Sequence, residues 1–455
     1  VDPARQAGLC TGVFGAKFAA CLGAVGVHIE TFIRIGVIWR APDKCRQQRV
    51  LYPTPSHFKL CGNRCITAGM SIITETTALA AFCERAAAFP FLTVDTEFIR
   101  EKTYWPILCL VQVGTPDEAV AIDALAEGID LEPLFDLMAN EDVLKVFHAA
   151  RQDVEIFVNL SGKVPKPIFD TQIAAMVCGY GDSVGYERLV RDIAKKSIDK
   201  TMRFTDWSRR PLGDKQIDYA LGDVTHLRKI YSKLAERLEA NDRTTWLADE
   251  MAILTDTATY LIDPNNAWKR LKTRSRKPRY LAAVKALAAW REQTAQGNNV
   301  PRNRVVKDES ITEIAAHMPK SADELMSLRA ISRDRVGNDR AREIVAVLED
   351  VRAMKPADYP DPPAERADTS DNGPSMELLK VLLKLKSDSH KVAQKLIASS
   401  GDIEAIAADD NADVRALSGW RLDVFGADAL RLKRGEIALT ADGAKIKVIE
   451  IPSQG

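Results

Sequence analysis

The chain has 455 residues, of which 46% are hydrophobic and 28% are charged, an ordinary soluble profile that allows two to four domains. Its formal net charge is +0, so the bulk charge indicates no class of partner, and local charge has to be considered instead.

The first 69 residues differ in composition from the rest of the chain. They hold five of the eight cysteines, namely Cys10, Cys21, Cys45, Cys61 and Cys65. Charged residues interrupt the apolar stretch 11–39, which excludes a typical membrane span, and no basic segment precedes a clean apolar core, which disfavours a secretory signal. We expect residues 1–69 to be a poorly structured extension, with Met70 as the natural start; a targeting segment is the alternative.

Residues 70–250 alternate between strand and helix patterns. The predicted strands are 89–98, 106–115, 118–125 and 144–150, and the predicted helices are 131–143, 151–160, 170–180 and 215–241. Asp170 is expected to cap the third helix. Three consecutive strands followed by helices indicate an α/β domain whose mixed sheet begins with antiparallel strands.

From residue 264 onward the pattern is helical. A first block covers 264–355, a linker rich in Pro, Asp and Ser covers 356–375, and a second helical block covers 376–455. The segments "LMSLRAISRDRVGND" and "VRALSGWRLDVFGAD" align at one constant offset, which pairs Gly337 with Gly426 and Asp339 with Asp428. This pattern indicates a duplicated helical unit, although helices reuse few residue types and chance similarity is the alternative.

Acidic residues lie at the edges and faces of the predicted elements. Asp95 and Glu97 follow a buried apolar run, and on a strand they point to the same face, where two like charges require a positive partner. Asp153 begins a helix that follows a strand, while Tyr219 and Asp223 lie one helical turn apart. Each feature alone is common in proteins of this size, but their combined order is more specific.

Four acids and a tyrosine in this arrangement predict a site for divalent cations. Mg²⁺ and Mn²⁺ prefer oxygen ligands, and pairs of such ions occur in nucleases and polymerases. We therefore interpret the positive partner of Asp95 and Glu97 as a metal ion.

Three segments resemble the exonuclease motifs of the DEDD superfamily in its tyrosine-bearing branch, "TVDTEF", "FHAARQD" and "YALGDV". The segments "TYWPILCLVQVG", "IFDTQIAAMV" and "DWSRRPLGDKQIDYALGDV" narrow the resemblance to the ribonuclease D family. The two helical blocks resemble HRDC domains. The resemblance runs from about Ser71 to the C-terminus.

This resemblance implies a ribonuclease H-like exonuclease domain (70–250) followed by two all-α HRDC-type bundles. It implies that Asp95, Glu97, Asp153 and Asp223 bind two divalent ions, Mg²⁺ or Mn²⁺, and that Tyr219 orients the attacking water. The implied reaction is hydrolysis of 3′-terminal phosphodiesters of RNA to 5′-mononucleotides, in the maturation of tRNA precursors. We expect a cytoplasmic monomer with no membrane partner, and we expect His148 to be structural.

A basic segment at the start of the first helical block is a candidate RNA contact. Residues 264–355 contain 20 Lys and Arg against 11 Asp and Glu, and the run "WKRLKTRSRKPRY" has aromatic residues at both ends. Basic side chains neutralise phosphates and aromatic rings stack on bases. The candidate residues are Arg274, Arg276, Lys277, Arg279 and Tyr280. An ordinary solvated face is the competing interpretation.

Two other functions are compatible with these motifs. One is a DNA-directed 3′–5′ exonuclease of the same superfamily, although the chain has no helicase or polymerase motif. The other is a non-catalytic RNA-binding scaffold, which the complete acid set argues against because unpaired carboxylates are costly to retain without a metal.

Overall fold

The computed structural model describes residues 72–199, 201–202, 205–273, 275–331, 333–362 and 372–452. The predictions for residues 1–69 and for residues 363–371 of the linker therefore lie outside the described residues. Among the helices that the structure describes, none combines the length and the apolar character needed to cross a membrane.

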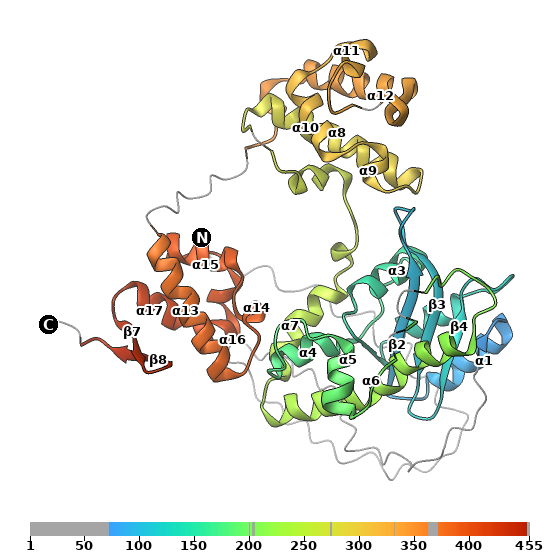
Figure 1. Cartoon of the computed structure of the whole chain (residues 1–455), viewed down its shortest axis with the longest axis vertical. Helices are drawn as coiled ribbons and strands as arrows, with labels where there is room; N and C mark the ends of the chain where they lie inside the picture. The colour runs from blue at the N-terminus through green and yellow to red at the C-terminus, as the bar shows by residue number, and fades with distance from the viewer. Residues whose placement is uncertain are drawn as a thin grey trace, which may run out of the picture. The chain divides into compact units, whose positions relative to one another are not determined.

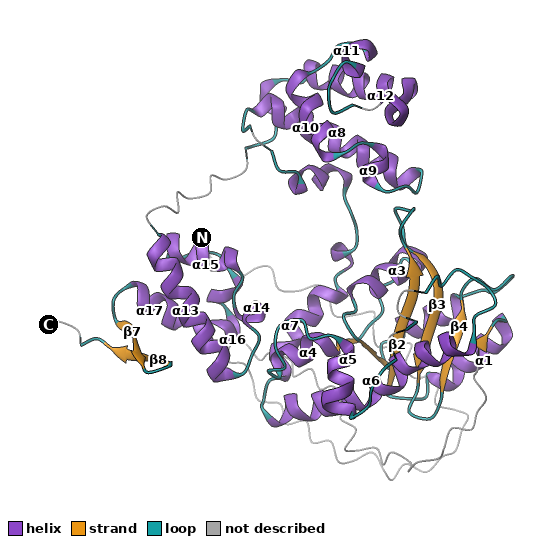
Figure 2. Ribbon diagram, in the orientation of Figure 1, coloured by secondary structure: helices purple, strands orange, loops and turns teal. Residues whose placement is uncertain are grey.

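A six-stranded mixed sheet forms the centre of the first domain (Figures 1 and 2). Its strands are β1 (Ile72–Ile73), β2 (Phe91–Ile99), β3 (Ile107–Gly114), β4 (Ala119–Asp123), β5 (Leu144–Phe147) and β6 (Ile168–Asp170), in the order β1-β4-β3-β2-β5-β6. The β2–β3 and β3–β4 pairs are antiparallel, while β2–β5, β5–β6 and β1–β4 are parallel. The predicted mixed sheet with an antiparallel beginning is confirmed.

The central position of β2 explains its sequence. It pairs with β3 on one side and β5 on the other, and residues 91–94 are buried. A strand enclosed in this way needs a continuous apolar run rather than an alternating one, and "FLTV" provides it. The acids Asp95 and Glu97 come directly after this run, so they are placed near the middle of the sheet.

Helices connect and flank these strands. They are α1 (Thr76–Ala86), α2 (Glu132–Ala139), α3 (Arg151–Ser161), α4 (Thr171–Val177), α5 (Tyr186–Leu189), α6 (Asp214–Ala240) and α7 (Thr244–Thr255). Asp170 caps α4 as predicted, because its side chain accepts hydrogen bonds from the backbone N–H groups of Gln172 and Ile173. Sequence patterns therefore located the helices 131–143, 151–160, 170–180 and 215–241 to within a few residues at each end.

The long helix α6 packs closely on strands β2 and β3. Thr93 Oγ1 donates a hydrogen bond to the carbonyl of Val224 at 2.9 Å, which fixes the helix against the sheet. A Cβ added at Gly114 would lie 2.5 Å from Thr93 Oγ1 and 3.4 Å from Val224 Cβ. Glycine at position 114 thus allows the close approach between the helix and the sheet.

The first helical block contains α8 (Pro278–Gly297), α9 (Arg302–Val305), α10 (Asp308–His317), α11 (Ala322–Met326) and α12 (Arg333–Ala353). The second contains α13 (Gly373–His390), α14 (Gln394–Ile397), α15 (Ser400–Ala408), α16 (Gly419–Arg421) and α17 (Ala427–Lys433). Each block has a long first helix, then a one-turn helix and a helix of nine or ten residues.

The prediction that the second block is entirely helical is wrong. Strands β7 (Ile437–Asp442) and β8 (Lys445–Glu450) pair as an antiparallel hairpin. The two turn residues are Gly443 and Ala444, and Gly443 has a φ of 60°, which a type II′ hairpin turn requires at its first residue. This dipeptide between two runs of β-branched and other apolar residues is the signal that the helical interpretation missed.

We predict that Gly114→Ala destabilises the first domain by about 1–3 kcal/mol and lowers its activity, because the added methyl group separates α6 from the sheet. Chemical denaturation measures the first effect. Gly297→Ala at the end of α8 is the matched control, since a Cβ there meets nothing within 4 Å. Equal stability of the two variants would contradict this account.

Candidate active site

Strand β2 presents two carboxylates on the face that α6 covers. Thr93, Asp95 and Glu97 occupy every second position of β2, so their side chains share one face of the sheet. Thr93 contacts the backbone of α6, which identifies this face. The β2–β3 register shifts between Glu97 and Phe98, an irregularity directly after the second acid, and the pairing then continues in the shifted register.

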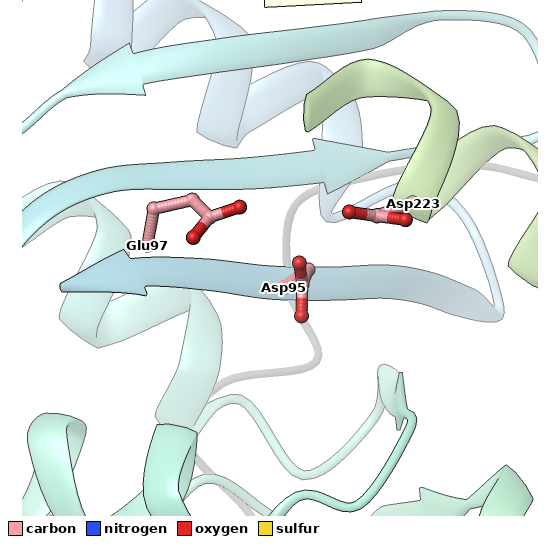
Figure 3. A group of neighbouring side chains, drawn as sticks. All are labelled: Asp95, Glu97 and Asp223. Carbon is pink, nitrogen blue, oxygen red and sulfur yellow. The ribbon is translucent and has the colours of Figure 1, made fainter. Parts of the chain in front are cut away.

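Helix α6 adds a third carboxylate to this pair. Ligand oxygens of Asp95, Glu97 and Asp223 all lie within 4.8 Å of one another. Figure 3 shows Asp95 and Glu97 on one strand, with Asp223 approaching from the helix. Tyr219 lies one turn before Asp223 and forms a side-chain hydrogen bond with it. The structure therefore brings three of the four predicted metal ligands together with the predicted tyrosine.

Asp153, the fourth predicted ligand, lies close to this group but has a different partner. It is buried in the first turn of α3, where its Oδ1 accepts a hydrogen bond from Thr96 Oγ1. Thr96 sits between Asp95 and Glu97 in the sequence. The charge of Asp153 nevertheless contributes to raising the pKa of both Asp95 and Glu97, so it acts electrostatically on the same site.

Burial and mutual repulsion raise the pKa values of these acids. Burial, followed by the charges of Asp223, Asp153 and Glu97, raises the pKa of Asp95 well above its usual value. Burial, followed by the charges of Asp223 and Asp153, raises the pKa of Glu97 to about 8. Burial raises the pKa of Asp223 to about 7 against the hydrogen bond from Tyr219. The group therefore retains protons near neutral pH until a cation takes their place.

The donor set fits hard divalent cations. Carboxylate oxygens are the preferred ligands of Mg²⁺ and Mn²⁺, whereas zinc sites use mainly His and Cys. Three acids with convergent oxygens can bind such ions directly, and a cation relieves the repulsion that raises their pKa values. Asp153 lies outside this convergent group, where Thr96 donates a hydrogen bond to it, and it acts on Asp95 and Glu97 through its charge.

A cavity of about 350 Å³ opens beside the carboxylates. Its lining includes Asp95, Tyr219 and Asp223, together with His148 and Tyr186. Tyr186 Oη donates hydrogen bonds to the backbone carbonyls of Gly222 and Asp223, at 3.2 and 2.5 Å. Sequence reasoning missed Tyr186, which comes from the short helix α5 and has no spacing relation to the motifs.

His148 also borders this cavity. Its Nδ1 lies 3.1 Å from Thr171 Oγ1, and its ring packs on Tyr186. Burial lowers the pKa of His148 to about 4, so the imidazole is neutral at physiological pH. These contacts support the structural role predicted for it.

A larger groove of about 1240 Å³ lies in the first helical block. Its lining includes three candidate RNA-binding residues, Lys277, Arg279 and Tyr280. The further cations are Arg270, Lys272, Lys320 and Arg352, against the acids Asp308, Glu309 and Glu313. Arg274 lies outside the described residues. The groove therefore has an excess of positive charge.

Comparisons with known proteins identify the first domain and the first helical block. A 3′–5′ exonuclease family model matches residues 70–239, and an HRDC domain model matches residues 281–348. Ribonuclease D of Nitrobacter hamburgensis is 51% identical over 381 residues, which cover 84% of this chain and 100% of that protein. Ribonuclease D of Jannaschia sp. is 54% identical over 383 residues, which cover 83% of this chain and 99% of that protein.

The chain belongs to the ribonuclease D family. It is also similar to the crystal structure of Escherichia coli RNase D, with a TM-score of 0.71, 31% identity, and coverage of 80% of this chain and 99% of that one. That protein is described as an exoribonuclease involved in structured RNA processing. Like other ribonucleases D, this protein is a hydrolytic 3′–5′ exoribonuclease, which excludes the non-catalytic scaffold.

We predict that Asp95→Asn makes the metal-free enzyme more stable at pH 8 while reducing its activity. The raised pKa of Asp95 means that the native state binds its proton more tightly than the unfolded state, whose Asp has a pKa of about 3.9. Wild-type stability therefore falls as the pH rises above about 4, and the neutral amide removes this loss. Activity should fall by more than the roughly 10–100-fold caused by losing an outer partner of a metal ligand.

Urea unfolding in EDTA at pH 5 and pH 8 measures this effect. The stabilisation by Asp95→Asn should be larger at pH 8 than at pH 5. Asp142→Asn is the control, because Asp142 is exposed and its substitution should change neither stability nor activity. A variant that is less stable than the wild type at pH 8 would show that the carboxylate is not repelled in the native state.

Proposed function

We propose that this exoribonuclease removes nucleotides one at a time from the 3′ ends of tRNA precursors, with Asp95, Glu97, Asp153 and Asp223 holding two divalent cations, Mg²⁺ or Mn²⁺. The observation that carries the proposal is the convergence of Asp95, Glu97 and Asp223 within 4.8 Å, beside a cavity that Asp95 and Asp223 line. Burial and the charges of three acidic neighbours raise the pKa of Asp95, which supports its role as a ligand that would hold the cations.

When bound, two divalent cations supply positive charge that stabilises the attacking and leaving oxygens of an in-line displacement. Tyr219 orients the attacking water through its phenol group, which Asp223 holds in place by a hydrogen bond. The water oxygen forms a bond to the terminal phosphorus as the bond from phosphorus to the 3′ oxygen breaks. The released nucleotide keeps a 5′ phosphate, and the shortened RNA keeps a free 3′ hydroxyl.

The position of Tyr219 supports assignment to the tyrosine-bearing branch of the superfamily. Its ring lines the cavity together with Asp95 and Asp223. The cavity volume of about 350 Å³ lies at the lower end of the range for small-molecule sites. A site of this size suits one terminal nucleotide rather than a continuous duplex, in agreement with action at an RNA end.

The groove of the first helical block is the proposed contact for the body of the RNA. Lys277 and Arg279 contribute cations that neutralise phosphates, and Tyr280 contributes an aromatic ring that stacks on bases. We propose Arg274 and Arg276 as further contacts on the basis of the sequence alone. In a folded RNA such as a tRNA precursor, phosphates of the RNA body bind in the groove while the 3′ end is hydrolysed.

We propose that residues 376–455 include a second HRDC-type unit. The succession of a long helix, a one-turn helix and a helix of nine or ten residues in both blocks supports this proposal. The aligned glycines differ in backbone conformation, since Gly337 has a φ of 62° and Gly426 a φ of −60°. The second unit has therefore diverged from the first around this position.

The cellular location and the oligomeric state stay predictions. Cys83, Cys109 and Cys178 are buried and form no disulfide among the described residues, which supports a reducing compartment such as the cytoplasm. A monomer is expected, and sedimentation of the purified protein would test it.

We predict that Tyr219→Phe lowers kcat on a 5′-labelled RNA by about 10²-fold or less while leaving KM nearly unchanged, because a positioned group contributes mainly to the chemical step. The substrate is a tRNA precursor with a short 3′ trailer, in Mg²⁺ or Mn²⁺. Wild-type enzyme should give a ladder shortening from the 3′ end.

The controls for this assay are EDTA and Asp153→Asn, each of which should abolish the ladder. A DNA oligonucleotide of matched sequence separates the two nuclease functions, since the proposed enzyme degrades RNA faster. Faster degradation of DNA would favour the DNA-directed exonuclease, and an unchanged kcat in Tyr219→Phe would remove the tyrosine from the mechanism.

We predict that the double variant Lys277→Ala/Arg279→Ala weakens binding of a tRNA precursor. The plot of log K against log[salt], which falls with salt, should become less steep by about 2, because each lost phosphate contact reduces its steepness by about 1. Hydrolysis of a short single-stranded RNA should change little, because it does not need the groove. Arg329→Ala/Lys355→Ala removes two exposed charges outside the groove and serves as the control. An identical slope in both double variants would refute RNA contact in the groove.

A further inference from the structure

Gln112 is a fully buried amide on strand β3, next to the carboxylate group. It lies directly opposite Asp95 in the antiparallel β2–β3 pair and opposite Ala121 on β4. Side chains of residues paired in this way are on the same face, with Cβ atoms about 4.5–5.5 Å apart. Gln112 is thus an immediate neighbour of Asp95.

Helix α6 covers Gln112 from above. Gly114, two residues further along the same face, lies against Val224 of α6. Leu110, two residues before Gln112, belongs to one buried cluster with Ala121 on β4 and Ala220 on α6. The side chain of Gln112 is therefore enclosed between the sheet and the helix that carries Tyr219 and Asp223.

The amide of Gln112 has no hydrogen-bond partner within the described part of the chain, either at Nε2 or at Oε1. Burying an amide without partners is costly, and an apolar side chain of similar shape would stabilise the fold better. Asp95 has a hydrogen bond from the backbone N–H of Thr96. Its ionised carboxylate has further lone pairs that can accept another.

We propose that Gln112 is a positioning residue whose amide Nε2 donates a hydrogen bond to the carboxylate of Asp95 when the site holds its cations. The inference rests on the metal site proposed above. Groups that hydrogen-bond a metal ligand fix its orientation and favour its charged form. The amide cannot itself take up a proton at neutral pH, so it provides a donor without adding charge to an already repulsive site.

This role explains why a polar side chain occupies the position. In the metal-free state the amide lowers stability, because its donors and acceptor are desolvated without partners among the described residues. In the loaded state the same donor stabilises the ionised ligand. Stability and metal binding should therefore respond in opposite directions to removal of the amide, which a residue serving only to pack the core would not do.

Gln112→Met tests this role, since methionine has a similar length and no strong donor. We expect its metal-free unfolding free energy to equal or exceed that of the wild type, and its Mn²⁺ affinity, measured by calorimetry, to fall about 10-fold or more. kcat should fall more than KM rises.

Asn159→Leu is the matched control, because the Nδ2 atom of Asn159 is also buried without a partner within the described residues. Asn159 lies about 9 Å along α3 from Asp153.

The outcomes separate this inference from the proposed site. Unchanged Mn²⁺ affinity in Gln112→Met, with normal binding by the wild type, would overturn the inference alone. Absence of Mn²⁺ binding by the wild type would overturn the proposed metal site as well. An equal loss of affinity in Asn159→Leu would also overturn the inference, because the effect would then not be specific to the neighbour of Asp95.

A crystal structure of the wild-type enzyme with Mn²⁺ supplies a test that does not depend on how any variant folds. We expect Gln112 Nε2 within about 3.2 Å of an Asp95 carboxylate oxygen. An amide that still has no contact with Asp95 in the loaded site would overturn the proposal.

Discussion

The repulsion among Asp95, Glu97 and Asp223 in a buried site is the constraint around which the first domain is organised. Half-buried carboxylates held within 4.8 Å of one another would separate if their backbones were free to move. They stay together because two of them lie on β2, which pairs with β3 at these positions and with β5 at residues 91–93, and the third lies on a helix of 27 residues packed against the same sheet. A bound cation would relieve this repulsion, which favours cation binding.

The close packing of α6 on the sheet keeps Asp223 beside Asp95 and Glu97. Gly114 leaves room for the helix, Thr93 hydrogen-bonds the carbonyl of Val224, and Tyr186 hydrogen-bonds the carbonyls of Gly222 and Asp223. These contacts act on the backbone of α6 within two residues of Asp223, so they fix the carboxylate without competing for its oxygens. Polar groups that stabilise the fold poorly, such as the unpaired amide of Gln112 and the clustered acids, concentrate beneath the same helix.

Several elements were predictable because their signals are local. Residues 91–94 are continuously apolar, Asp170 is a strong N-cap, and α6 repeats apolar residues at helical spacing, so each element was located from the sequence. Strands β1 and β6 were not predicted because two or three residues carry too little pattern. The β7–β8 hairpin was missed because its Gly-Ala turn lies in a segment dominated by helices.

The sequence by itself determined the set of acids, the tyrosine one turn before Asp223 and the order of the domains, because residue type and spacing along one element are fixed by local geometry. Only the tertiary structure determined which of these side chains lie next to one another. It placed Asp95, Glu97 and Asp223 together, gave Asp153 the hydroxyl of Thr96 as its partner, and set Tyr186 and Gln112 beside the site. The contacts between different elements join residues 17 to 128 positions apart, and their formation depends on strand register and helix packing, which no short segment encodes.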